Sequence, residues 1–356
     1  MDEAVVDKQA VVADIQRWAA ELGFARAAIT GPDLAHAEAG MLAWLEAGFH
    51  GEMDYMARHG LKRARPAELV PGTRSIVSVI LPYLPPSAAD SEAVLADDAK
   101  AYVSRYALGR DYHKVLRARL QALADRLAAR IGPFGHRVFV DSAPVLEVEL
   151  AKQAGLGWRG KHTLLIHRDH GSFFFIGELF TDLDLPHDAP TAVEHCGRCT
   201  RCLDFCPTQA IVAPYTVDAR RCVSYLTIEL KGPIPLALRP LIGNRVYGCD
   251  DCQLVCPWNR FAADSRELDF QIRNGLDDVT LVELFAWSEA DFQRNLAGSA
   301  IYRIGHERWL RNLAVGLGNA RTTPSVVAAL QARRDDASEL VREHVAWALA
   351  RHGAAA

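Results

Sequence analysis

The apolar positions in the first half of the chain alternate between a helical period and an extended one. Helical spacing predicts helices over residues 5–22, 33–47, 113–132 and 145–158. β-Branched and aromatic runs predict strands over residues 24–30, 75–84 and 136–144, and a β-hairpin over residues 162–185 that turns at Asp169–Gly171. The run from Ser75 is continuously apolar, which is typical of a buried strand. Loops are predicted at residues 48–74 and 85–100.

Beyond residue 262 the pattern becomes purely helical. Short amphipathic helices are predicted over residues 280–287, 289–297, 305–319, 323–334 and 339–353. Their paired arrangement resembles a HEAT-type helical repeat. The sequence therefore predicts an α+β chain in three parts. These are an α/β domain over residues 1–190, a cysteine-rich segment over residues 191–262 and an all-α repeat domain over residues 263–356.

Composition narrows the class of protein only modestly. Half of the 356 residues are apolar and 24% are charged, as in soluble globular proteins with a large core. No apolar run reaches transmembrane length, and residues 1–18 lack the basic and apolar regions of an export signal. We therefore expect a cytoplasmic protein. The net charge of −4 gives no global sign of a nucleic-acid partner, although it averages over any local basic patch.

All eight cysteines lie between Cys196 and Cys256, in two related runs. The first run, from Cys196 to Pro207, has the spacing C-x2-C-x2-C-x3-C-P that bacterial two-cluster ferredoxins use. The second run, from Cys249 to Pro257, is C-x2-C-x3-C-P, and Cys222 can supply its missing first cysteine. The pattern predicts two [4Fe–4S] clusters in a ferredoxin-like segment, and therefore a protein that delivers electrons.

The fourth cysteine of each ferredoxin run crosses to the other cluster. Applied here, that rule gives Cys196, Cys199, Cys202 and Cys256 to the first cluster, and Cys206, Cys222, Cys249 and Cys252 to the second. Two other uses of the thiols stay open. Structural zinc would need two pairs of ligands around one tetrahedral ion, and disulfides would suit a small secreted scaffold. The successive x2 spacings suit the corners of a cubane better than one zinc ion, and a chain of this length is unlike a small disulfide scaffold.

A second local feature is the arginine-rich stretch over residues 296–334. The stretch contains six arginines and only one acid, Glu307, and aromatic side chains lie among them. The arginines are Arg303, Arg308, Arg311, Arg321, Arg333 and Arg334. A basic helical face with aromatic residues can follow a phosphate backbone. Charge alone favours a solvated helix face, so both interpretations stay open.

Several stretches together resemble the epoxyqueuosine reductases, cobalamin-dependent iron–sulfur enzymes that complete queuosine in tRNA. Besides the cysteine runs, they include SRYALGRDYHKVL, VDSAPVLEVELAKQAGLGWRGKHTLLI, GSFFFIGELFTDL, CVSYLTIELKGPIP and GCDDCQLVCPWN. The resemblance implies base-off cobalamin in the N-terminal domain, reduced by electrons from the two clusters. It also implies tRNA bound over the cobalamin, partly by the C-terminal helices. We further expect an unidentified low-potential electron donor, and a monomer, since the protein must admit a tRNA. The chain lacks the D-x-H-x-x-G motif, which agrees with a corrin held without a protein imidazole.

Asp141, in VDSAP, matches the catalytic aspartate of that family. The implied reaction is a two-electron reduction of an epoxide that loses its oxygen as water, so an acid must protonate that oxygen. A carboxyl whose pKa is raised by burial over a corrin would supply the proton at neutral pH. Without the resemblance, Asp141 would be interpreted as a turn residue that caps a helix starting near Pro144.

Further contacts also follow from the resemblance. The implied cobalamin contacts are Arg63, Tyr106, Asp141, Lys161, Ser224, Asp250 and Asp251, and the implied tRNA contacts are Arg303, Arg308, Arg311 and Lys231. Each has a plainer role open to it, as a surface charge or in loop hydrogen bonding. The glycine-rich stretch before Lys161 lacks the spacing and the GK[ST] ending of a phosphate-binding loop.

Two other functions would use the same cysteines. A cobalamin-dependent reductive dehalogenase joins a cobalamin domain to a two-cluster segment, but it usually carries a twin-arginine export signal, which residues 1–18 lack. A non-catalytic two-cluster electron carrier would explain the cysteines but not the long N-terminal domain. The sequence therefore favours reduction of epoxyqueuosine to queuosine at the wobble position of tRNA.

Overall fold

A four-stranded sheet forms the centre of the N-terminal half. The computed structural model describes residues 7–190 and 193–354. The strand order is β1-β2-β7-β4 and every neighbouring pair is antiparallel. The strands are β1 (Arg26–Thr30), β2 (Ser75–Pro82), β4 (His136–Val140) and β7 (Phe174–Thr181). The predicted strands and the mixed α and β character are confirmed, and the antiparallel pairing makes the sheet one layer of an α+β domain.

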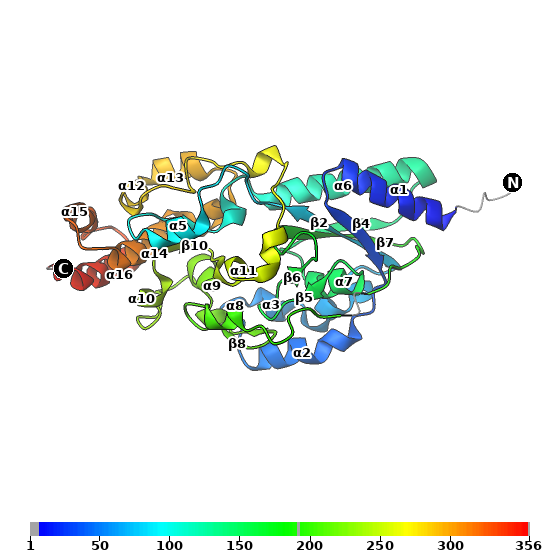
Figure 1. Ribbon diagram of the computed structural model, residues 1–356, viewed down its shortest axis with the longest axis horizontal. Coiled ribbons are helices and arrows are strands. Elements are labelled where there is room, and N and C mark those ends of the chain that lie inside the picture. Colours follow the sequence, from blue (N-terminus) through cyan, green and yellow to red (C-terminus); the bar gives the residue numbers. More distant parts are fainter. Residues whose placement is uncertain (1–6, 191–192, 355–356) are drawn as a thin grey trace.

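Helices cover both faces of this sheet (Figure 1). α1 (Lys8–Glu21) and α6 (Tyr112–Ile131) pack on one face, where Val77 and Val79 of β2 meet Leu116 of α6. α2 (Ala35–Glu46) and α7 (Glu147–Gln153) lie on the other side of the sheet. Because strand side chains alternate between faces, a strand covered on both sides must be apolar throughout. This explains the continuous apolar run from Ser75. The predicted start of the first helix at residue 5 lies outside the described residues.

The predicted β-hairpin over residues 162–185 is wrong in its pairing. The turn lies where it was predicted, and an isolated antiparallel bridge joins His167 to Gly171. However, β6 (Leu165–Ile166) pairs with β5 (Trp158–Arg159), while β7 enters the large sheet. The predicted loops also contain short helices, namely α3 (Tyr55–Arg58), η1 (Gly60–Ala64), α4 (Pro66–Leu69) and α5 (Ser91–Ala96). Long-range pairing decided the partner of β7, and residue patterns along one segment do not carry that information.

The cysteine-rich segment consists of short elements. They are α8 (Arg201–Asp204), β8 (Ile211–Ala213), β9 (Thr216–Val217), η3 (Ala219–Arg221), α9 (Val223–Ile228), α10 (Arg239–Ile242), β10 (Arg245–Tyr247), α11 (Asp251–Leu254) and η4 (Pro257–Phe261). α8 and α11, one from each cysteine run, pack against each other. β10 pairs in parallel with β3 (Tyr102–Val103), and η2 (Arg105–Ala107) follows β3. A stretch of the N-terminal half therefore lies beside the second cysteine run.

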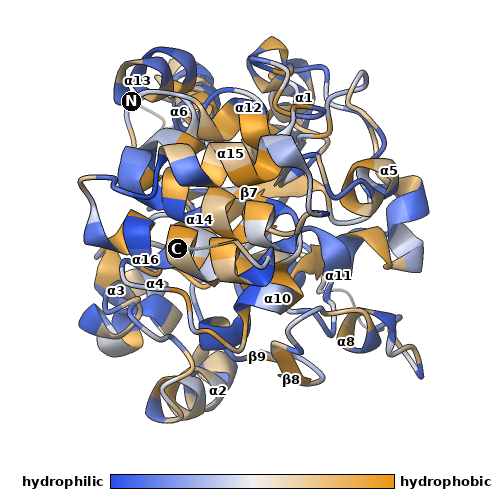
Figure 2. Cartoon of the chain, turned by 90° about the vertical axis from the view of Figure 1, so that its left-hand side faces the viewer, coloured by the Kyte–Doolittle hydropathy of each residue, from blue (hydrophilic) through white to orange (hydrophobic). Residues whose placement is uncertain are grey.

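The C-terminal helices pack around α14 (Gly305–Asn319), as the end-on view shows (Figure 2). The predicted helices are confirmed as α12 (Leu281–Phe285), α13 (Glu289–Leu296), α14, α15 (Pro324–Ala332) and α16 (Glu339–Arg351), with η5 (Leu268–Phe270) and η6 (Ala300–Ile304) between segments. Their core also contains Val103 and Val246, from earlier in the chain. The division at residues 190 and 262 stays a prediction, and this apolar core crosses it.

Arg311 ties α14 to the cysteine-rich segment. Its guanidinium is fully buried and donates to the backbone oxygens of Leu226, Leu230 and Gly232 and to Oδ1 of Asn312. Burial lowers the pKa of Arg311 to about 9. The prediction that Arg311 contacts tRNA is therefore wrong, and the alternative of a solvated face does not hold for Arg311 either, although Arg321 and Arg334 of the same stretch are exposed. All of its donors point inward, where carbonyl groups at the end of α9 would otherwise lack partners.

We expect Arg311→Met to lower the free energy of unfolding by about 3 kcal/mol or more, because several buried carbonyl oxygens would lose their hydrogen bonds. Chemical denaturation followed by circular dichroism measures this change. Arg321→Met is the matched control, since Arg321 is 81% exposed and pairs only with a surface aspartate; it should change stability by less than about 0.5 kcal/mol. Equal stability of the two variants would contradict the structural role of Arg311.

Candidate active site and cluster centres

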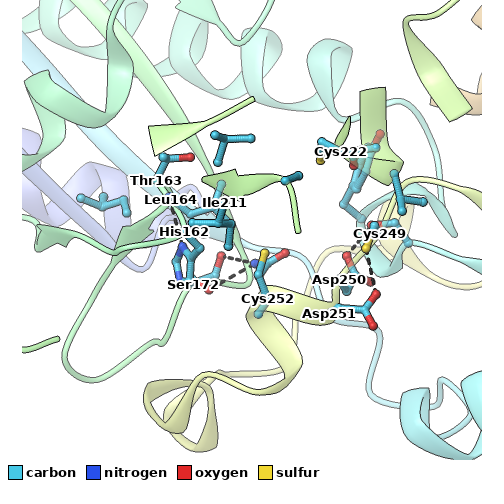
Figure 3. A pocket seen from close by; sticks show the side chains of 18 of the residues that line it. His162, Thr163, Leu164, Ser172, Ile211, Cys222, Cys249, Asp250, Asp251 and Cys252 are labelled. Carbon is cyan, nitrogen blue, oxygen red and sulfur yellow. Dashed lines mark hydrogen bonds between the residues drawn. The ribbon is translucent and has the colours of Figure 1, made fainter. Parts of the chain in front are cut away.

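A cavity of about 360 Å³ lies between the sheet and the cysteine-rich segment. Its apolar wall includes Val148, Leu165, Phe175, Ile176 and Ile211. Figure 3 shows Cys222 and Cys249 on one side of this cavity and His162, Thr163 and Leu164 on the other, with Cys252 between them. Asp141 opens onto the same cavity. An acid and a group of cysteines from distant parts of the chain therefore share one space.

The cysteines gather in the two sets that the crossed ferredoxin rule predicts. Burial and then the neighbouring sulfurs of Cys196, Cys256 and Cys199 raise the pKa of Cys202 to about 11. Burial likewise raises the pKa of Cys252, and the neighbouring sulfurs of Cys222 and Cys206 raise it further. Cys202 and Cys252 are thus each surrounded mainly by members of their own predicted set.

The two sets take different places in the molecule. All four cysteines of the second set line the cavity: Cys206, Cys222, Cys249 and Cys252. Those of the first set line a small adjoining hollow: Cys196, Cys199, Cys202 and Cys256. Cys199 of the first set is exposed. The second set therefore faces the cavity and the first set faces the outside. Among the residues that the structure describes, no three metal-binding side chains converge on a single ion, whereas the sulfurs around a cubane stand further apart.

Asp141 stands directly after β4, where the strand ends in a turn. Its backbone has φ of +28°, an uncommon conformation for a residue other than glycine. Its carboxyl accepts a hydrogen bond from Tyr112 Oη, and His113 Nε2 lies 3.3 Å from its Oδ2. α7 begins only at Glu147, and its N-cap residue Leu146 makes no side-chain capping bond. The alternative of Asp141 as a helix cap is therefore wrong.

A chain of charged groups continues from Asp141 through His113. The other ring nitrogen of His113, Nδ1, lies 2.9 Å from Oδ1 of Asp111 and 2.8 Å from the guanidinium of Arg303. Arg303 also pairs with Asp111. Asp111 caps α6, which places His113 in its first turn. Arg303 comes from η6, so the C-terminal half of the chain completes the surroundings of Asp141.

The electrostatics of Asp141 differ from the sequence-based expectation. Burial acts to raise its pKa, but the close contact with His113, the hydrogen bond from Tyr112 and the positive charges of His113 and Arg303 outweigh it. The pKa of Asp141 is therefore lowered, and the predicted raised value is wrong. For His113, burial acts to lower the pKa, yet the two flanking carboxylates raise it overall. The contact therefore favours a protonated His113 beside an ionised Asp141, although the nearby charge of Arg303 acts against the proton on His113.

Two further carboxyls lie near Asp141. Glu147 opens onto the cavity, and Glu178 is fully buried in β7 with no hydrogen-bond partner among the described residues. Burial raises the pKa of Glu147 well above its usual value and that of Glu178 to about 8, and the negative charge of Asp141 adds to both shifts. Glu178 is therefore largely protonated at neutral pH, and burial favours the neutral form of Glu147 as well, which limits further negative charge beside Asp141.

Of the predicted cobalamin contacts, Tyr106, Asp141, Ser224, Asp250 and Asp251 line the cavity. The carboxyl groups of the last two serve the protein itself. Asp250 accepts bonds from Tyr102 Oη, Ser104 Oγ and the Arg105 amide, and Asp251 pairs with Arg245. These two aspartates therefore shape the wall of the cavity but have few free acceptors for a bound group.

Arg63 and Lys161 do not line the cavity, so the structure gives no support to their prediction as cobalamin contacts. Arg63 is buried and donates to the carbonyl oxygens of Tyr55 and Met56. Lys161 donates to the carbonyl oxygens of Gly197 and Cys199, in the first cysteine run. Both basic side chains donate hydrogen bonds to backbone carbonyl oxygens, whose partial negative charge stabilises the positive charge.

The site fits a large, mostly apolar cofactor with amide side chains, such as cobalamin. A second hollow of about 780 Å³ adjoins the cavity at Glu147, Val148, Thr163 and Val217. Nε2 of His162 is buried and has no partner among the described residues. Its Nδ1 accepts from the Leu164 amide, and burial lowers the pKa of His162 to about 4. His162 therefore stays neutral and presents an unused N–H donor, which a corrin amide oxygen would satisfy.

The remaining predicted tRNA contacts have different surroundings. Arg308 uses its donors on the backbone oxygens of Ile304, Ile228 and Arg303, so its prediction as a tRNA contact is not supported by its geometry. Arg303 is half-exposed beside Asp111. Lys231 is exposed in the loop after α9. Arg303 and Lys231 thus remain the accessible cations of the predicted set.

Sequence reasoning missed Tyr112, His113, Asp111, Glu147 and His162. The first three stand in the stretch SRYALGRDYH, where Asp111 has the ordinary pattern of a helix cap. Nothing in the residue pattern shows that β4 delivers Asp141 to this helix start. Only the packing of α6 on the sheet brings them together.

An acid coupled to a histidine, two sets of four cysteines and a large cofactor cavity define an iron–sulfur redox enzyme. A family model described as "Epoxyqueuosine reductase QueG, DUF1730" matches residues 63–142. A second model, "4Fe-4S double cluster binding domain", matches residues 195–259. Epoxyqueuosine reductases from Burkholderia pseudomallei and Pseudomonas aeruginosa are each 61% identical to this chain; the first alignment covers 94% of this chain and 90% of the relative, the second 98% and 96%. The Escherichia coli enzyme is 54% identical over 97% of this chain and 90% of its own length.

Solved structures agree with these relatives. An epoxyqueuosine reductase with a tRNA-Tyr epoxyqueuosine-modified tRNA stem loop is 27% identical, with a TM-score of 0.88 over 98% of this chain and 91% of that one. The Bacillus subtilis enzyme, with its catalytic aspartate loop swung out of the active site, is 26% identical, with a TM-score of 0.88 over 97% of this chain and 91% of that one. The chain belongs to the epoxyqueuosine reductase family. Two [4Fe–4S] clusters and cobalamin are its cofactors.

No helix in the described part of the chain combines the length and apolar character needed to cross a bilayer.

Replacing Cys206 tests the crossed arrangement of the cysteines. Cys206→Ala should damage the cluster that faces the cavity, because Cys206 lies with Cys222 and Cys252, and should leave the outer cluster intact. Electron paramagnetic resonance of the reduced protein distinguishes the two clusters. Cys199→Ala is the matched control and should damage the outer cluster instead. Loss of the outer cluster in Cys206→Ala would show that the two sets do not cross.

Proposed function

We propose that this chain reduces epoxyqueuosine to queuosine at the wobble position of tRNA anticodon loops. The observation that carries the proposal is that Asp141, coupled to His113, opens onto the same cavity as the inner set of cysteines. Membership of the family supports the same reaction. A relative with this fold binds an epoxyqueuosine-modified tRNA stem loop. Neither a dehalogenase nor a simple electron carrier would account for these relatives.

The reaction sets the task of the acid. Removal of the epoxide oxygen as water consumes two electrons and two protons and leaves a carbon–carbon double bond. The opening oxygen must be protonated, and Asp141 is the acid that faces the cavity. Asp141 is ionised at rest, so it needs a proton source, and the protonated form of His113, with Nε2 3.3 Å from Oδ2 of Asp141, can pass it the proton that Asp141 delivers to the oxygen. Tyr112 orients the carboxyl through its hydrogen bond.

The two cysteine sets define an electron path. Cys196, Cys199, Cys202 and Cys256 hold the outer cluster, and Cys206, Cys222, Cys249 and Cys252 hold the inner one. Cobalamin, when bound, supplies the low-potential electrons for the reduction. Tyr106, Ser224 and His162 would hold it, since they line the cavity beside the inner set. The apolar wall excludes water from the reacting groups.

The RNA would approach where Asp141 is accessible. Arg303 and Lys231 are the exposed cations that we assign to it, because anionic backbones are bound chiefly by such side chains. A modified base splayed out of the anticodon loop can enter a cavity, as single-stranded RNA commonly does. We also propose that the protein acts as a monomer, in the cytoplasm, with a low-potential donor and a HEAT-like C-terminal part over residues 263–356.

The reaction is tested with reconstituted protein, cobalamin, a low-potential reductant and epoxyqueuosine-containing tRNA under anaerobic conditions. Mass spectrometry of the nucleosides should show the loss of one oxygen atom. Omission of cobalamin should abolish the conversion, and Asp141→Asn should lower its rate by about 100-fold or more, because the amide cannot deliver a proton. Absence of conversion by protein that demonstrably holds both clusters and cobalamin would refute the proposed function.

The coupling of Asp141 to His113 predicts a pH dependence. The pKa of His113 is raised by its two carboxylate neighbours, so the rate should fall as the pH rises through that raised pKa and the shared proton is lost. His113→Gln should lower kcat by about 100-fold and remove this alkaline decline. His136→Gln, at an exposed site on β4, is the control and should keep the wild-type profile. An alkaline decline that persists unchanged in His113→Gln would assign it to another group.

A further inference from the structure

A separate hollow of about 740 Å³, distinct from those described above, opens on the surface beside the outer cysteine set. Cys256 and Pro257 form part of its floor, and Arg201, Phe205 and Arg260 stand around it. This hollow shares no lining residue with the cavity that contains Asp141. The mechanism proposed above uses none of its side chains except Cys256.

The rim of this hollow is positively charged, although the chain as a whole carries a net charge of −4. Arg201 and Arg260, which line the hollow, are exposed, and so is Arg198 in the first cysteine run; within the described residues none of the three takes part in an ion pair. Lys161 lies apart from this rim, in the small hollow lined by the outer cysteine set, where it donates to the carbonyl oxygens of Gly197 and Cys199. The acids close by are Glu92, which lines the hollow, and Asp204, whose carboxylate accepts a bond from Thr200. Cations therefore outnumber acids where the outer set approaches the surface.

Exposed aromatic rings accompany these charges. Phe205 is 63% exposed and Phe261 is 40% exposed, and the guanidinium of Arg260 lies 4.6 Å from the centre of the Phe261 ring. Large apolar side chains beside unpaired arginines are typical of protein contact surfaces. α8, which carries Arg201, lies at the edge of the molecule in Figure 2. A partner of moderate size can therefore reach this surface.

We propose that this arginine-flanked hollow docks a small acidic electron-carrier protein, which reduces the outer cluster. The inference rests on the proposed assignment of Cys196, Cys199, Cys202 and Cys256 to that cluster. Each encounter oxidises the carrier by one electron and reduces the cluster by one, so two encounters supply the two electrons of one turnover.

Charge and position favour this partner over RNA. A negatively charged carrier is steered to a cationic rim, and transient electron-transfer complexes use small interfaces of this kind. RNA would also be attracted by arginines, but it brings no electrons to Cys256, and its modified base must enter the other cavity, beside Asp141.

The test compares two reductants on the reconstituted holoenzyme. Stopped-flow absorbance measures cluster reduction by a reduced flavodoxin, an acidic one-electron carrier, and by reduced methyl viologen, a small cation. In Arg201→Glu/Arg260→Glu, the second-order rate with flavodoxin at low salt should fall at least tenfold, and its dependence on salt should flatten. The rate with methyl viologen should not fall. Affinity for oxidised flavodoxin, measured by calorimetry, should fall in parallel.

Arg130→Glu/Arg137→Glu makes the same charge change at exposed positions of the sheet domain and should leave the flavodoxin rate within about twofold of the wild-type rate. An unchanged flavodoxin rate in Arg201→Glu/Arg260→Glu would overturn the proposal. So would an equal loss with both reductants, because the damage would then lie in the cluster. A selective loss of tRNA affinity would assign the hollow to RNA instead. Cluster reduction is measured without tRNA, so failure of the proposed reaction would not affect this result.

Discussion

A carboxylate buried beside the inner cysteines constrains the whole site. Asp250 lies between Cys249 and Cys252 in sequence and accepts three hydrogen bonds, from Tyr102 Oη, Ser104 Oγ and the Arg105 amide. A buried carboxylate is tolerated only when its lone pairs are satisfied. The second cysteine run must therefore fold against residues 102–105, which also places Tyr106 in the cavity wall. The hydrogen bonds of the Asp250 carboxylate thus join the wall of the cofactor cavity to the cysteines of the electron path.

The acid of the site is likewise a product of several elements. β4 supplies Asp141, the first turn of α6 supplies His113, and η6 supplies Arg303. The carboxylates on either side of His113 raise its pKa, and the contacts with His113, Tyr112 and Arg303 lower the pKa of Asp141. Proton storage and proton delivery are therefore divided between two side chains. We assign Arg303 to RNA binding, and its charge also lowers the pKa of Asp141. Contact of Arg303 with the RNA would therefore change the acidity of Asp141.

The arginines show why charge counts are poor guides to function. Arg311 and Arg308 stand in the same basic stretch as Arg303, yet their donors are taken up by backbone carbonyls around α9. Arg201 and Arg260, which no charge run emphasised, lie exposed beside the outer cysteines. A guanidinium can end a helix, fill a core or meet a partner, and the sequence pattern is the same in each case.

The sequence by itself determined the local features and the chemistry of close neighbours. Helix and strand positions followed from apolar periodicity, and the cysteine spacing predicted the two sets, because ligands a few residues apart are held together by the chain itself. Asp141 required the resemblance to a known family. Only the tertiary structure decided that β7 leaves its hairpin, that His113 meets Asp141, and that Arg311 is buried. These contacts join residues far apart in the sequence, and their energies depend on packing and desolvation, which a local pattern does not contain.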